Sequence, residues 1–460
     1  MRLPLLRRRR GVSWEELVRM PPDVIASHAD NVIPFPQDRT VAFKRFCVAT
    51  PAGLKFRAPL LGKYIVENLP VASGGGQLYV YDSGVYRNGE TSLKRLIADL
   101  LGVDWTRTRE GETLAWLLAT ADALNEQPPT NIINVRNGLL HVSKRGAVRL
   151  KPHDSKLLTP IQLPVTYDPT ASCPGIDEFL SQVFPSRALL RLVEEVAGYT
   201  MVPDNSLQIA IMLRGPGGNG KSTFLNLLTS LLGSENIVHR QLQDFDEDRF
   251  AAVDLYGRLA NICADLSSRE LQSSSKFKEI TGGDTITGER KYRDAFSFKP
   301  FARLLFSAND IPLARDGSLA FFDRWIIVPC EVRIRGTAAQ DEQILQKLTT
   351  EQELSGFLNV ALKGLARLRQ AKRFTIPAEA RAEQWRFRTH ADTVAAFADA
   401  KPLKRRVWIS KPDLYRTYVD WCADAKLPAL NAMRFHERYP EVVSVVGKRR
   451  RGYDGFQRTG

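Results

Sequence analysis

A glycine-rich loop that joins an apolar run to a helical pattern is the part of this 460-residue chain with the most definite chemistry. The segment reads GPGGNGKST and fits the pattern G-x-x-x-x-G-K-[ST]. Glycines at these positions let backbone N–H groups approach a phosphate that side chains would otherwise block. Lys221 is then expected against the β and γ phosphates of a nucleoside triphosphate, and Ser222 on Mg²⁺. The predicted phosphate-binding residues are Gly215, Pro216, Gly217, Gly218, Asn219, Gly220, Lys221, Ser222 and Thr223.

Three polar residues at the ends of later apolar runs could complete a hydrolytic site. Asp265 ends an apolar run, where a carboxylate could bind Mg²⁺ and activate water, although single acids at strand ends are common. Asn309 ends the next run and could orient the attacking water. Arg324 begins a further run, and its alternative role is a surface ion pair with Asp323. We predict a catalytic set of Lys221, Asp265, Asn309 and Arg324, with Ser222 and Asp265 as metal ligands.

The elements that would position these residues follow from periodicity. Apolar runs alternate with helical spacing over residues 203–340, which is typical of a parallel sheet covered by helices. A helix is expected at 224–232, so that its N-terminus points at the bound phosphate. The predicted fold class is therefore α/β, with a P-loop ATPase core. The candidate strands are Gln208 to Leu213, Arg258 to Ala264, Arg303 to Ser307 and Trp325 to Pro329.

Four other segments are predicted to flank this core. Residues 1–55 contain four consecutive arginines and proline-rich turns, and we expect a basic, poorly ordered arm. Residues 56–202 mix strand and helix patterns, including helical spacing at 113–124 and 177–199, and we expect a largely helical domain. Residues 341–394 have helical spacing and are expected to form a connector. Residues 395–460 read as helix, turn, helix, a short alternating run and a basic turn, which is the order of a winged helix.

The net charge of +14 lies entirely at the two ends of the chain. Residues 1–60 contain 11 Lys and Arg against 5 Asp and Glu, residues 401–460 contain 14 against 6, and the remainder has 40 of each. Basic ends on a neutral middle favour contact with nucleic acid, although solvated basic tails without a partner are the alternative. The side chains suited to duplex backbone contacts, with steep salt dependence and modest sequence preference, are Arg434, Lys448, Arg449, Arg450 and Arg451.

A second basic segment lies inside the core. Residues 288–293 read GERKYR, between a turn-forming Gly-Gly-Asp and an alternating Phe-Ser-Phe, and this pattern predicts a β-hairpin with a basic tip. Lys291 is the first candidate for a phosphate contact, with Arg290, Tyr292 and Arg293 beside it. A charged hairpin without a partner is the alternative.

Other patterns argue against several classes of protein. The five cysteines are scattered, without a C-x-x-C pair, so neither a zinc site nor a disulfide framework is indicated and a reducing compartment fits best. No apolar run approaches the roughly 20 residues of a membrane span, and we expect a location in the host cytoplasm. The acidic run at 244–248 resembles a metal site, but a solvated loop is the expected structure.

The order of these motifs resembles the superfamily 3 helicases, in particular the helicase module of phage, plasmid and poxvirus-type primase-helicases. The likeness covers about residues 60–460 and rests on GPGGNGKST, LANICADLS, FKEITGGDTITGERKYRDAFSFKP, LLFSANDIP and FFDRWIIVP in family order. The segments GVYRNGE, NVRNGLL and YDPTASCPGIDEFL are also similar to the domain that precedes the ATPase in this family. The resemblance implies an AAA+-like core.

By that resemblance the glycine loop is Walker A, Asp265 the Walker B acid and Asn309 the sensor 1 amide. Arg324 would be an arginine finger that reaches the γ-phosphate of a neighbouring subunit, which implies a homo-oligomeric ring, usually a hexamer. The Lys291 hairpin would grip a single DNA strand in the channel. One departure concerns Ala264, which stands where many members have a second acid, so the group that polarises the water stays open.

The resemblance implies an ATP- and Mg²⁺-dependent DNA helicase in the replication of a phage, prophage or mobile element, with duplex DNA at the winged helix. The roughly 60 residues before the helical domain are too few for the primase domain found in many relatives, so a separate primase or polymerase is the expected partner. The alternatives are an ATP-driven origin-melting initiator or duplex DNA translocase, and a nucleotide-regulated DNA-binding scaffold. The complete set of hydrolytic residues argues against the scaffold.

Overall fold

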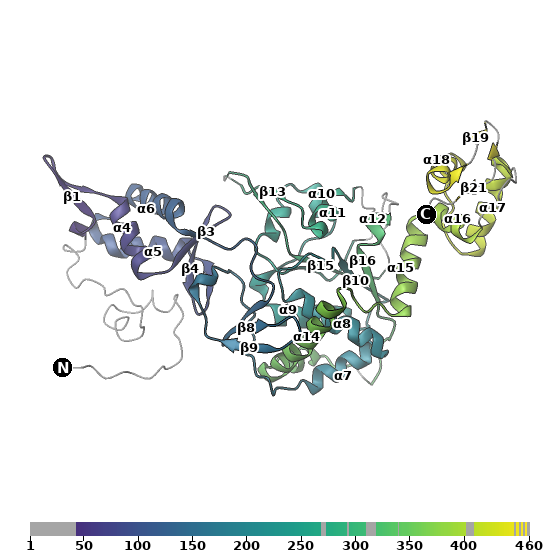
Figure 1. The fold of residues 1–460 in the computed structure, drawn as a ribbon, viewed down its shortest axis with the longest axis horizontal. Coiled ribbons are helices and arrows are strands. Elements are labelled where there is room, and N and C mark those ends of the chain that lie inside the picture. Colours follow the sequence, from purple (N-terminus) through teal and green to yellow (C-terminus); the bar gives the residue numbers. More distant parts are fainter. Residues whose placement is uncertain are drawn as a thin grey trace.

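A computed structural model of the chain arranges its elements in three successive parts (Figure 1). An N-terminal part with α4, α5 and α6 precedes a central part built on a parallel sheet, and α15 leads to a C-terminal helical part. None of the described helices is long and apolar enough to cross a membrane. The residues that the structure describes are 43–267, 273–291, 294–309, 319–338, 340–401, 409–445, 448–449, 452–453 and 456–457.

The central sheet has five parallel strands in the order β11-β12-β15-β10-β16. Four of them confirm the strands predicted from the apolar runs. The fifth, β11, has two residues, too few for a periodic pattern to reveal. The strands are β10 (Ala210–Arg214), β11 (Ile237–Val238), β12 (Ala260–Cys263), β15 (Arg303–Ala308) and β16 (Trp325–Pro329).

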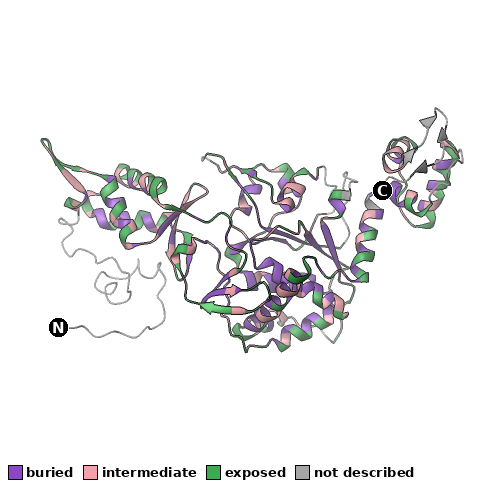
Figure 2. Ribbon diagram, in the orientation of Figure 1, coloured by how far each residue is buried: buried purple, intermediate pink, exposed green. Residues whose placement is uncertain are grey.

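Both faces of this sheet are buried, as is usual for a parallel sheet (Figure 2). Along β10, Ile211 and Leu213 enter one apolar core, and the alternate residues Ala210 and Met212 enter another. The first core includes α7 (Pro174–Val183), α8 (Arg187–Thr200), α9 (Lys221–Leu232) and α14 (Glu351–Ala371). The second includes α11 (Ser275–Gly282), α12 (Leu319–Phe322) and α15 (Ala378–Ala391).

Helices from two separately predicted segments meet in the first core. The helical pattern predicted at 177–199 is two helices, because the chain breaks at Pro185 and Ser186 then caps α8 by accepting a hydrogen bond from Leu189 N–H at 3.1 Å. In the predicted connector, α13 (Ile344–Leu348) precedes α14, and α14 packs along α8. The predicted N-terminal domain and connector therefore share one core with the sheet, since both contribute apolar helix faces to it.

Two glycines allow α8 and α14 to approach closely. A Cβ at Gly364 would collide with the main chain of Glu194 and Glu195, and one at Gly198 would collide with Ala361 and Leu365. The main chains of the two helices therefore touch at these positions, where a larger residue would force them apart.

The N-terminal part begins with an ordered hairpin. Strands β1 (Cys47–Thr50) and β2 (Gly53–Phe56) pair antiparallel, and Phe46 packs in a core with residues of α4 (Ala58–Asn68). The prediction of a poorly ordered arm is therefore wrong for residues 43–55, because the burial of Phe46 anchors this hairpin. Residues 1–42 of the predicted arm lie outside the described residues.

A four-stranded sheet completes the N-terminal part, in the order β5-β4-β3-β6. Helix α6 ends at Thr120, before the predicted end at 124, because the chain enters β6 and Leu124 N–H donates to Ser73 O at 2.7 Å. The strands are β3 (Val71–Gly74), β4 (Gln77–Asp82), β5 (Val85–Asn88) and β6 (Asp122–Ala123), and the further helices are α5 (Glu90–Leu101) and α6 (Arg107–Thr120).

Three strands, β7 (Ile132–Val135), β8 (Gly138–Val142) and β9 (Val148–Lys151), connect the N-terminal part to the first core. The predicted basic hairpin is confirmed: β13 (Ile286–Gly288) pairs antiparallel with β14 (Phe296–Phe298). The acidic run forms a short helix, α10 (Asp244–Glu247), and the prediction of a loop is wrong because Phe245 is buried in the second core.

The C-terminal part packs three helices, α16 (Thr393–Ala400), α17 (Lys411–Asp424) and α18 (Ala432–Val442), around Phe397, Tyr418 and Phe435. The short strands around them are β17 (Ile409–Ser410), β18 (Ser444–Val445), β19 (Lys448–Arg449), β20 (Gly452–Tyr453) and β21 (Phe456–Gln457). β19 pairs antiparallel with β20, so Lys448 and Arg449 fall on a strand of a small hairpin. Arg450 and Arg451 lie outside the described residues.

The glycine contact between α8 and α14 gives a test of the first core. Gly364→Ala should destabilise the protein by about 1–3 kcal/mol, because the added methyl group must separate two packed helices. The matched control is Gly111→Ala in α6, where no atom outside the local helix backbone and the two adjacent residues lies within 4 Å of the added Cβ. This change should stabilise by about 0.5–1 kcal/mol through helix propensity. Thermal denaturation followed by circular dichroism measures both, and a rise in melting temperature for both variants would contradict the packing.

Candidate active site

The glycine loop leaves the carboxyl end of a central strand and leads directly into a helix. β10 lies between β15 and β16, and α9 begins at Lys221. Gly218 and Gly220 have φ of +80° and +79°, in the left-handed region that glycine adopts without strain. Crevices at the carboxyl ends of parallel strands are the usual ligand sites of such sheets. The loop therefore lies where a ligand can reach the N-terminus of α9.

Lys221 folds back over its own loop. Its Nζ donates to the carbonyl oxygens of Gly215 at 2.6 Å and Pro216 at 2.9 Å, and to Asn219 Oδ1 at 3.1 Å. Asn309 Oδ1 is a fourth acceptor at 3.4 Å. Burial lowers the pKa of Lys221, and the nearby Cys330 and Asp265 oppose this shift. The ammonium group is thus held among neutral oxygens at the start of α9, with a carboxylate close by.

The segment after β16 holds the other side of the loop. The Asn219 side-chain amide donates to the Cys330 carbonyl, and Cys330 N–H donates to Arg214 O at 2.8 Å. A Cβ at Gly215 would collide with the Cys330 main chain, so this close approach requires glycine. The loop conformation therefore depends on a segment more than 100 residues away in sequence.

The polar residues predicted at two other strand ends line the same cavity as the loop. This cavity has a volume of about 390 Å³ and includes Lys221, Ser222, Asp265 and Asn309 in its lining. Ser307 donates to the Ala264 carbonyl and so links the ends of β15 and β12. The structure brings three predicted catalytic residues together, and their roles in a reaction stay predictions.

The donor set suits a hard divalent cation. The Ser222 hydroxyl and the Asp265 carboxylate are oxygen ligands, and both residues line the cavity beside the loop. Mg²⁺ prefers oxygen ligands and commonly takes one or two carboxylates together with phosphate oxygens. These residues would hold Mg²⁺ against a bound polyphosphate.

Arg324, the fourth predicted catalytic residue, lies away from this cavity. Trp325 pairs with Ala210 at the amino end of β10, whereas the loop follows the carboxyl end of that strand. The Arg324 guanidinium donates to Ala320 O at 2.6 Å and to Gln208 Oε1 at 3.4 Å. Among the described residues it forms no ion pair with Asp323. Arg324 therefore does not contribute to the cavity of its own chain.

Arg335 is a cavity residue that the sequence did not identify. The backbone N–H groups of Ile334 and Arg335 donate to Gly218 O at 2.8 and 2.9 Å, and Arg335 lines the cavity. Its guanidinium is exposed and has no hydrogen-bond or ion-pair partner among the described residues. The sequence signal is the pair of arginines in Val332-Arg333-Ile334-Arg335, but spacing alone could not select one of them.

The predicted hairpin residues have different surroundings. Lys291 is exposed, as expected of a residue at the tip. Arg290 instead contacts the N-terminal part: its guanidinium donates to Gly75 O and lies 5.2 Å from the centre of the Phe296 ring and 5.9 Å from that of Tyr256. Arg290 thus anchors the base of the hairpin. Tyr292 and Arg293 lie outside the described residues.

The remaining predicted DNA contact with a described side chain is Arg434. It lies in the first turn of α18 and is exposed, and its backbone N–H donates to the capping Asn431 side chain at 3.0 Å. A basic side chain in the exposed first turn of a helix can reach a DNA backbone.

Two known families match parts of the chain. Residues 74–185 match the family described as D5 N terminal like. Residues 213–324 match a family of unknown function, DUF5906. The second match contains the glycine loop and the strand ends that carry Asp265 and Asn309.

Two viral proteins are similar to this chain, and in each case the similar region is only a part of the viral protein. "Putative helicase 121R" from Invertebrate iridescent virus 3 is 24% identical over 323 residues, which is 60% of this chain and 33% of that protein. "Putative helicase L207/L206" from Acanthamoeba polyphaga mimivirus is 25% identical over 162 residues, which is 34% of this chain and 17% of that protein. The chain therefore spans about a third of the first relative and a sixth of the second.

Among solved structures, the chain is similar to the C-terminal region of NrS-1. The A form apo structure has a TM-score of 0.48 with 10% identity, and the alignment covers 86% of this chain and 97% of that one. A further apo structure of this region has a TM-score of 0.47 with 11% identity, and the alignment covers 88% of this chain and 100% of that one.

Proposed function

We propose, from the premise that the chain belongs to the phage and viral primase-helicase family, that it is an ATP-dependent DNA helicase of superfamily 3. It would work as a homo-oligomeric ring, usually a hexamer, in replication in the host cytoplasm. The observation that carries the proposal is the convergence of Lys221, Asp265 and Asn309 on one cavity beside the glycine loop. An ATPase of the AAA+ type is further supported by the sheet order, in which Asp265 and Asn309 follow the two strands on one side of β10.

The loop side of the cavity would bind the phosphates of ATP. The N-terminus of α9 carries a partial positive charge and unpaired N–H groups, which favour an anion. Lys221 donates to neutral oxygens, and charged phosphate oxygens would accept stronger hydrogen bonds from it. Asn309 Oδ1, which accepts from Lys221 Nζ at 3.4 Å, would orient a water molecule near the terminal phosphate.

Mg²⁺ would be held by Ser222 and Asp265, and when bound it would neutralise charge on the β and γ phosphates. Asp265 is the only carboxylate among the lining residues of the cavity in the part of the chain that the structure describes. The Asp265 carboxylate would then bind the metal ion, and the Asn309 side-chain amide would hold the attacking water.

The position of Arg324 supports a site shared between subunits. Arg324 lies at the amino end of the sheet, and the five residues of β10 span about 16 Å at ~3.3 Å per residue. A guanidinium at that end cannot reach the phosphate loop of its own chain. It would therefore act on the nucleotide of a neighbouring subunit, which requires an assembly.

The C-terminal part would bind duplex DNA as a winged helix. Its three helices and small hairpin follow the order of that fold, and Arg434 is exposed on α18. Lys448 and Arg449 belong to strand β19 of the hairpin. In the central part, the exposed Lys291 would contact a single strand through its phosphates.

Strand displacement on a forked DNA with ATP and Mg²⁺ tests the proposal. The protein should unwind the fork, and Lys221→Ala should abolish both hydrolysis and unwinding, because the ammonium group contacts the transferred phosphate. Lys291→Ala should hydrolyse ATP and fail to unwind. Hydrolysis without displacement by the unmodified protein would instead favour an origin-melting initiator or duplex translocase. Binding of ATP without turnover would favour a nucleotide-regulated scaffold.

Arg335 should contribute to nucleotide affinity, because it lines the cavity and its guanidinium has no partner among the residues that the structure describes. Arg335→Ala should weaken ATP binding about 10- to 100-fold, as expected for the loss of a charged hydrogen bond worth roughly 1.5–3 kcal/mol. Titration with a fluorescent ATP analogue measures this affinity. The matched control is Arg333→Ala, two residues away and outside the cavity lining. Equal affinities of the two variants for the ATP analogue would show that Arg335 does not contact the nucleotide.

A mixing experiment tests whether Arg324 acts between subunits. Arg324→Ala should lower turnover by about 10³–10⁵. Mixing inactive Arg324→Ala and Lys221→Ala proteins should restore partial ATPase activity, because about one interface in four then combines an intact loop with an intact arginine. Mixtures that stay inactive, although the two proteins co-assemble, would show that Arg324 does not act on a neighbouring subunit.

A further inference from the structure

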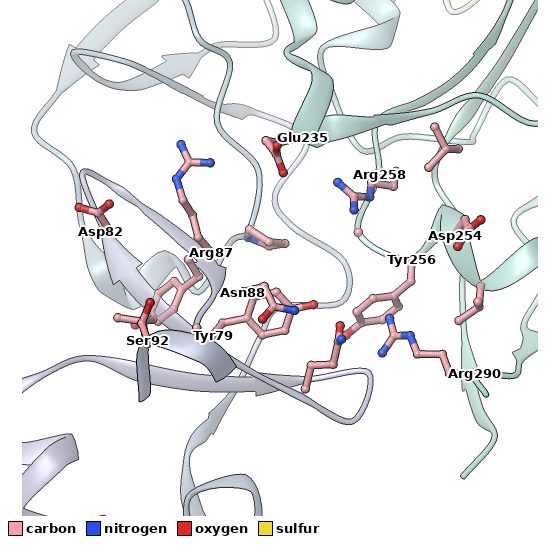
Figure 3. Close-up of a pocket in the computed structure, with 18 residues that line it drawn as sticks. Tyr79, Asp82, Arg87, Asn88, Ser92, Glu235, Asp254, Tyr256, Arg258 and Arg290 are labelled. Atoms are coloured by element: carbon pink, nitrogen blue, oxygen red, sulfur yellow. The ribbon is translucent and has the colours of Figure 1, made fainter. Parts of the chain in front are cut away.

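A cavity of about 560 Å³ lies between the N-terminal part and the central part (Figure 3). One wall comes from β4, β5 and the start of α5, and it includes Tyr79, Arg87 and Asn88. The opposite wall comes from the segment before β12, with Tyr256 and Arg258, and from the hairpin residue Arg290. Its volume is within the roughly 300–1,000 Å³ of typical ligand sites. This cavity is separate from the one that contains the glycine loop.

Two arginines in the lining of this cavity, Arg87 and Arg258, supply cationic groups. Neither Arg87 nor Arg258 has a side-chain hydrogen bond or ion pair with any residue that the structure describes. They line opposite walls of the cavity and lie on either side of Glu235 in Figure 3. Guanidinium groups in the lining of one cavity, without a partner among the described residues, suit a ligand with phosphate groups.

The lining holds three carboxylates, Asp82, Glu235 and Asp254, against three arginines, Arg87, Arg258 and Arg290, so its charge depends on which carboxylates are paired elsewhere. Asp254 is already paired with Arg240, whose Nη2 lies 2.6 Å from Asp254 Oδ2. Asp82 accepts a hydrogen bond from Ser83 Oγ at 2.9 Å, but this neutral partner leaves its negative charge in place. Glu235 has no ion-pair partner within the described part of the chain, and it lies between Arg87 and Arg258 in the view of Figure 3. Glu235 should therefore oppose an anionic ligand that the two arginines attract.

Aromatic rings supply the apolar part of the cavity. Tyr79 and Tyr256 are partly exposed and line opposite walls. The Tyr256 ring is held edge-on by Phe296 and Phe298, with ring centres 5.2 and 5.4 Å away. Burial raises the pKa of Tyr256, so its phenol stays uncharged and does not repel phosphate. A rigid, neutral ring beside arginines is the combination on which nucleic-acid bases stack.

The cavity is continuous with the hairpin proposed to contact DNA. Arg290 belongs to its lining, and the next residue in the chain is the exposed Lys291. The bond from Arg290 to Gly75 O also fixes the hairpin base against the wall formed by β3 and β4. Lys291 is thus directly next in the chain to a residue of the cavity lining, and a strand that it holds would pass close to this cavity.

We infer that this cavity binds single-stranded DNA next to the Lys291 hairpin, with phosphates at Arg87 and Arg258 and a base against Tyr256 or Tyr79. The inference rests on the proposed function and adds a second contact region for the same strand. A free nucleotide has the same chemistry as one unit of the strand, so the test includes both.

The test is the affinity for a fluorescent oligothymidylate, measured by anisotropy at several salt concentrations without ATP. The double variant Arg87→Ala/Arg258→Ala should bind at least about 10-fold more weakly, and the slope of log affinity against log salt should fall by about 1.4, at ~0.7 for each lost phosphate contact. Glu235→Gln should bind more tightly, because it removes a negative charge without changing the side-chain shape. Two changes of opposite sign cannot both come from misfolding.

Matched controls separate a local contact from the net charge of the protein. Arg145→Ala/Arg149→Ala removes two exposed arginines in and beside β9, outside the cavity, and should leave the affinity within about twofold. ATP hydrolysis without DNA should be unchanged in the cavity variants, since none of these residues lines the loop cavity. Equal losses in the two double variants would overturn the inference.

The remaining outcomes distinguish this inference from the proposed function. If the unmodified protein does not bind the oligonucleotide, the helicase proposal fails with it. If Lys291→Ala weakens binding while the cavity double variant does not, the helicase proposal stands and the cavity assignment is wrong. The double variant could also lose affinity for thymidine monophosphate and keep its affinity for the oligonucleotide. That result would show that the cavity binds a free nucleotide and not a DNA strand.

Discussion

The parallel arrangement of the central sheet is the constraint on which the candidate site depends. Parallel strands end at a common edge, so residues that follow β10, β12 and β15 must come close together there. Lys221, Asp265 and Asn309 are more than 40 residues apart in sequence and line one cavity for this reason. The same constraint places Arg324 at the opposite edge, because it precedes its strand. One topological rule thus explains both the shared cavity and the need for a second subunit in the proposed mechanism.

The loop is stabilised by parts of the chain that lie far from it in sequence. The Cys330 carbonyl accepts a hydrogen bond from the Asn219 side-chain amide, and Gly218 O accepts hydrogen bonds from two N–H groups of the segment after β16. Beneath the loop, α9 packs in a core with α8 and α14, whose main chains touch at Gly198 and Gly364. Glu383 of α15 forms an ion pair with Arg214 at 3.0 Å, directly before the loop. The helix that leads to the C-terminal part is therefore fixed to the strand that carries the loop.

Contacts with the N-terminal part connect the candidate DNA surfaces to this core. The turn between β3 and β4 packs on Tyr256, Phe296 and Arg290, where a Cβ at Gly75 would lie 3.0 to 3.2 Å from each of them. Because Arg290 belongs to the β13–β14 hairpin, movement of that hairpin would alter the wall of the inter-part cavity. A strand in this cavity would thus contact a surface whose shape depends on the central part.

The sequence by itself determined the local chemistry: the GPGGNGKST loop, the four longer strands and the basic hairpin follow from residue type and from spacing over a few positions. It also gave Asp265 and Asn309 as strand-end residues, since short-range periodicity marks where strands stop. It could not show that Arg335 lines the cavity, that Arg290 bonds to Gly75, or that residues 43–55 form an ordered hairpin. Each of these features depends on a partner distant in the chain. The tertiary structure alone decided these features, as it did the contact of α8 with α14 and the cavity of Arg87 and Arg258. Contacts between distant segments arise from packing of whole elements, which no local pattern encodes.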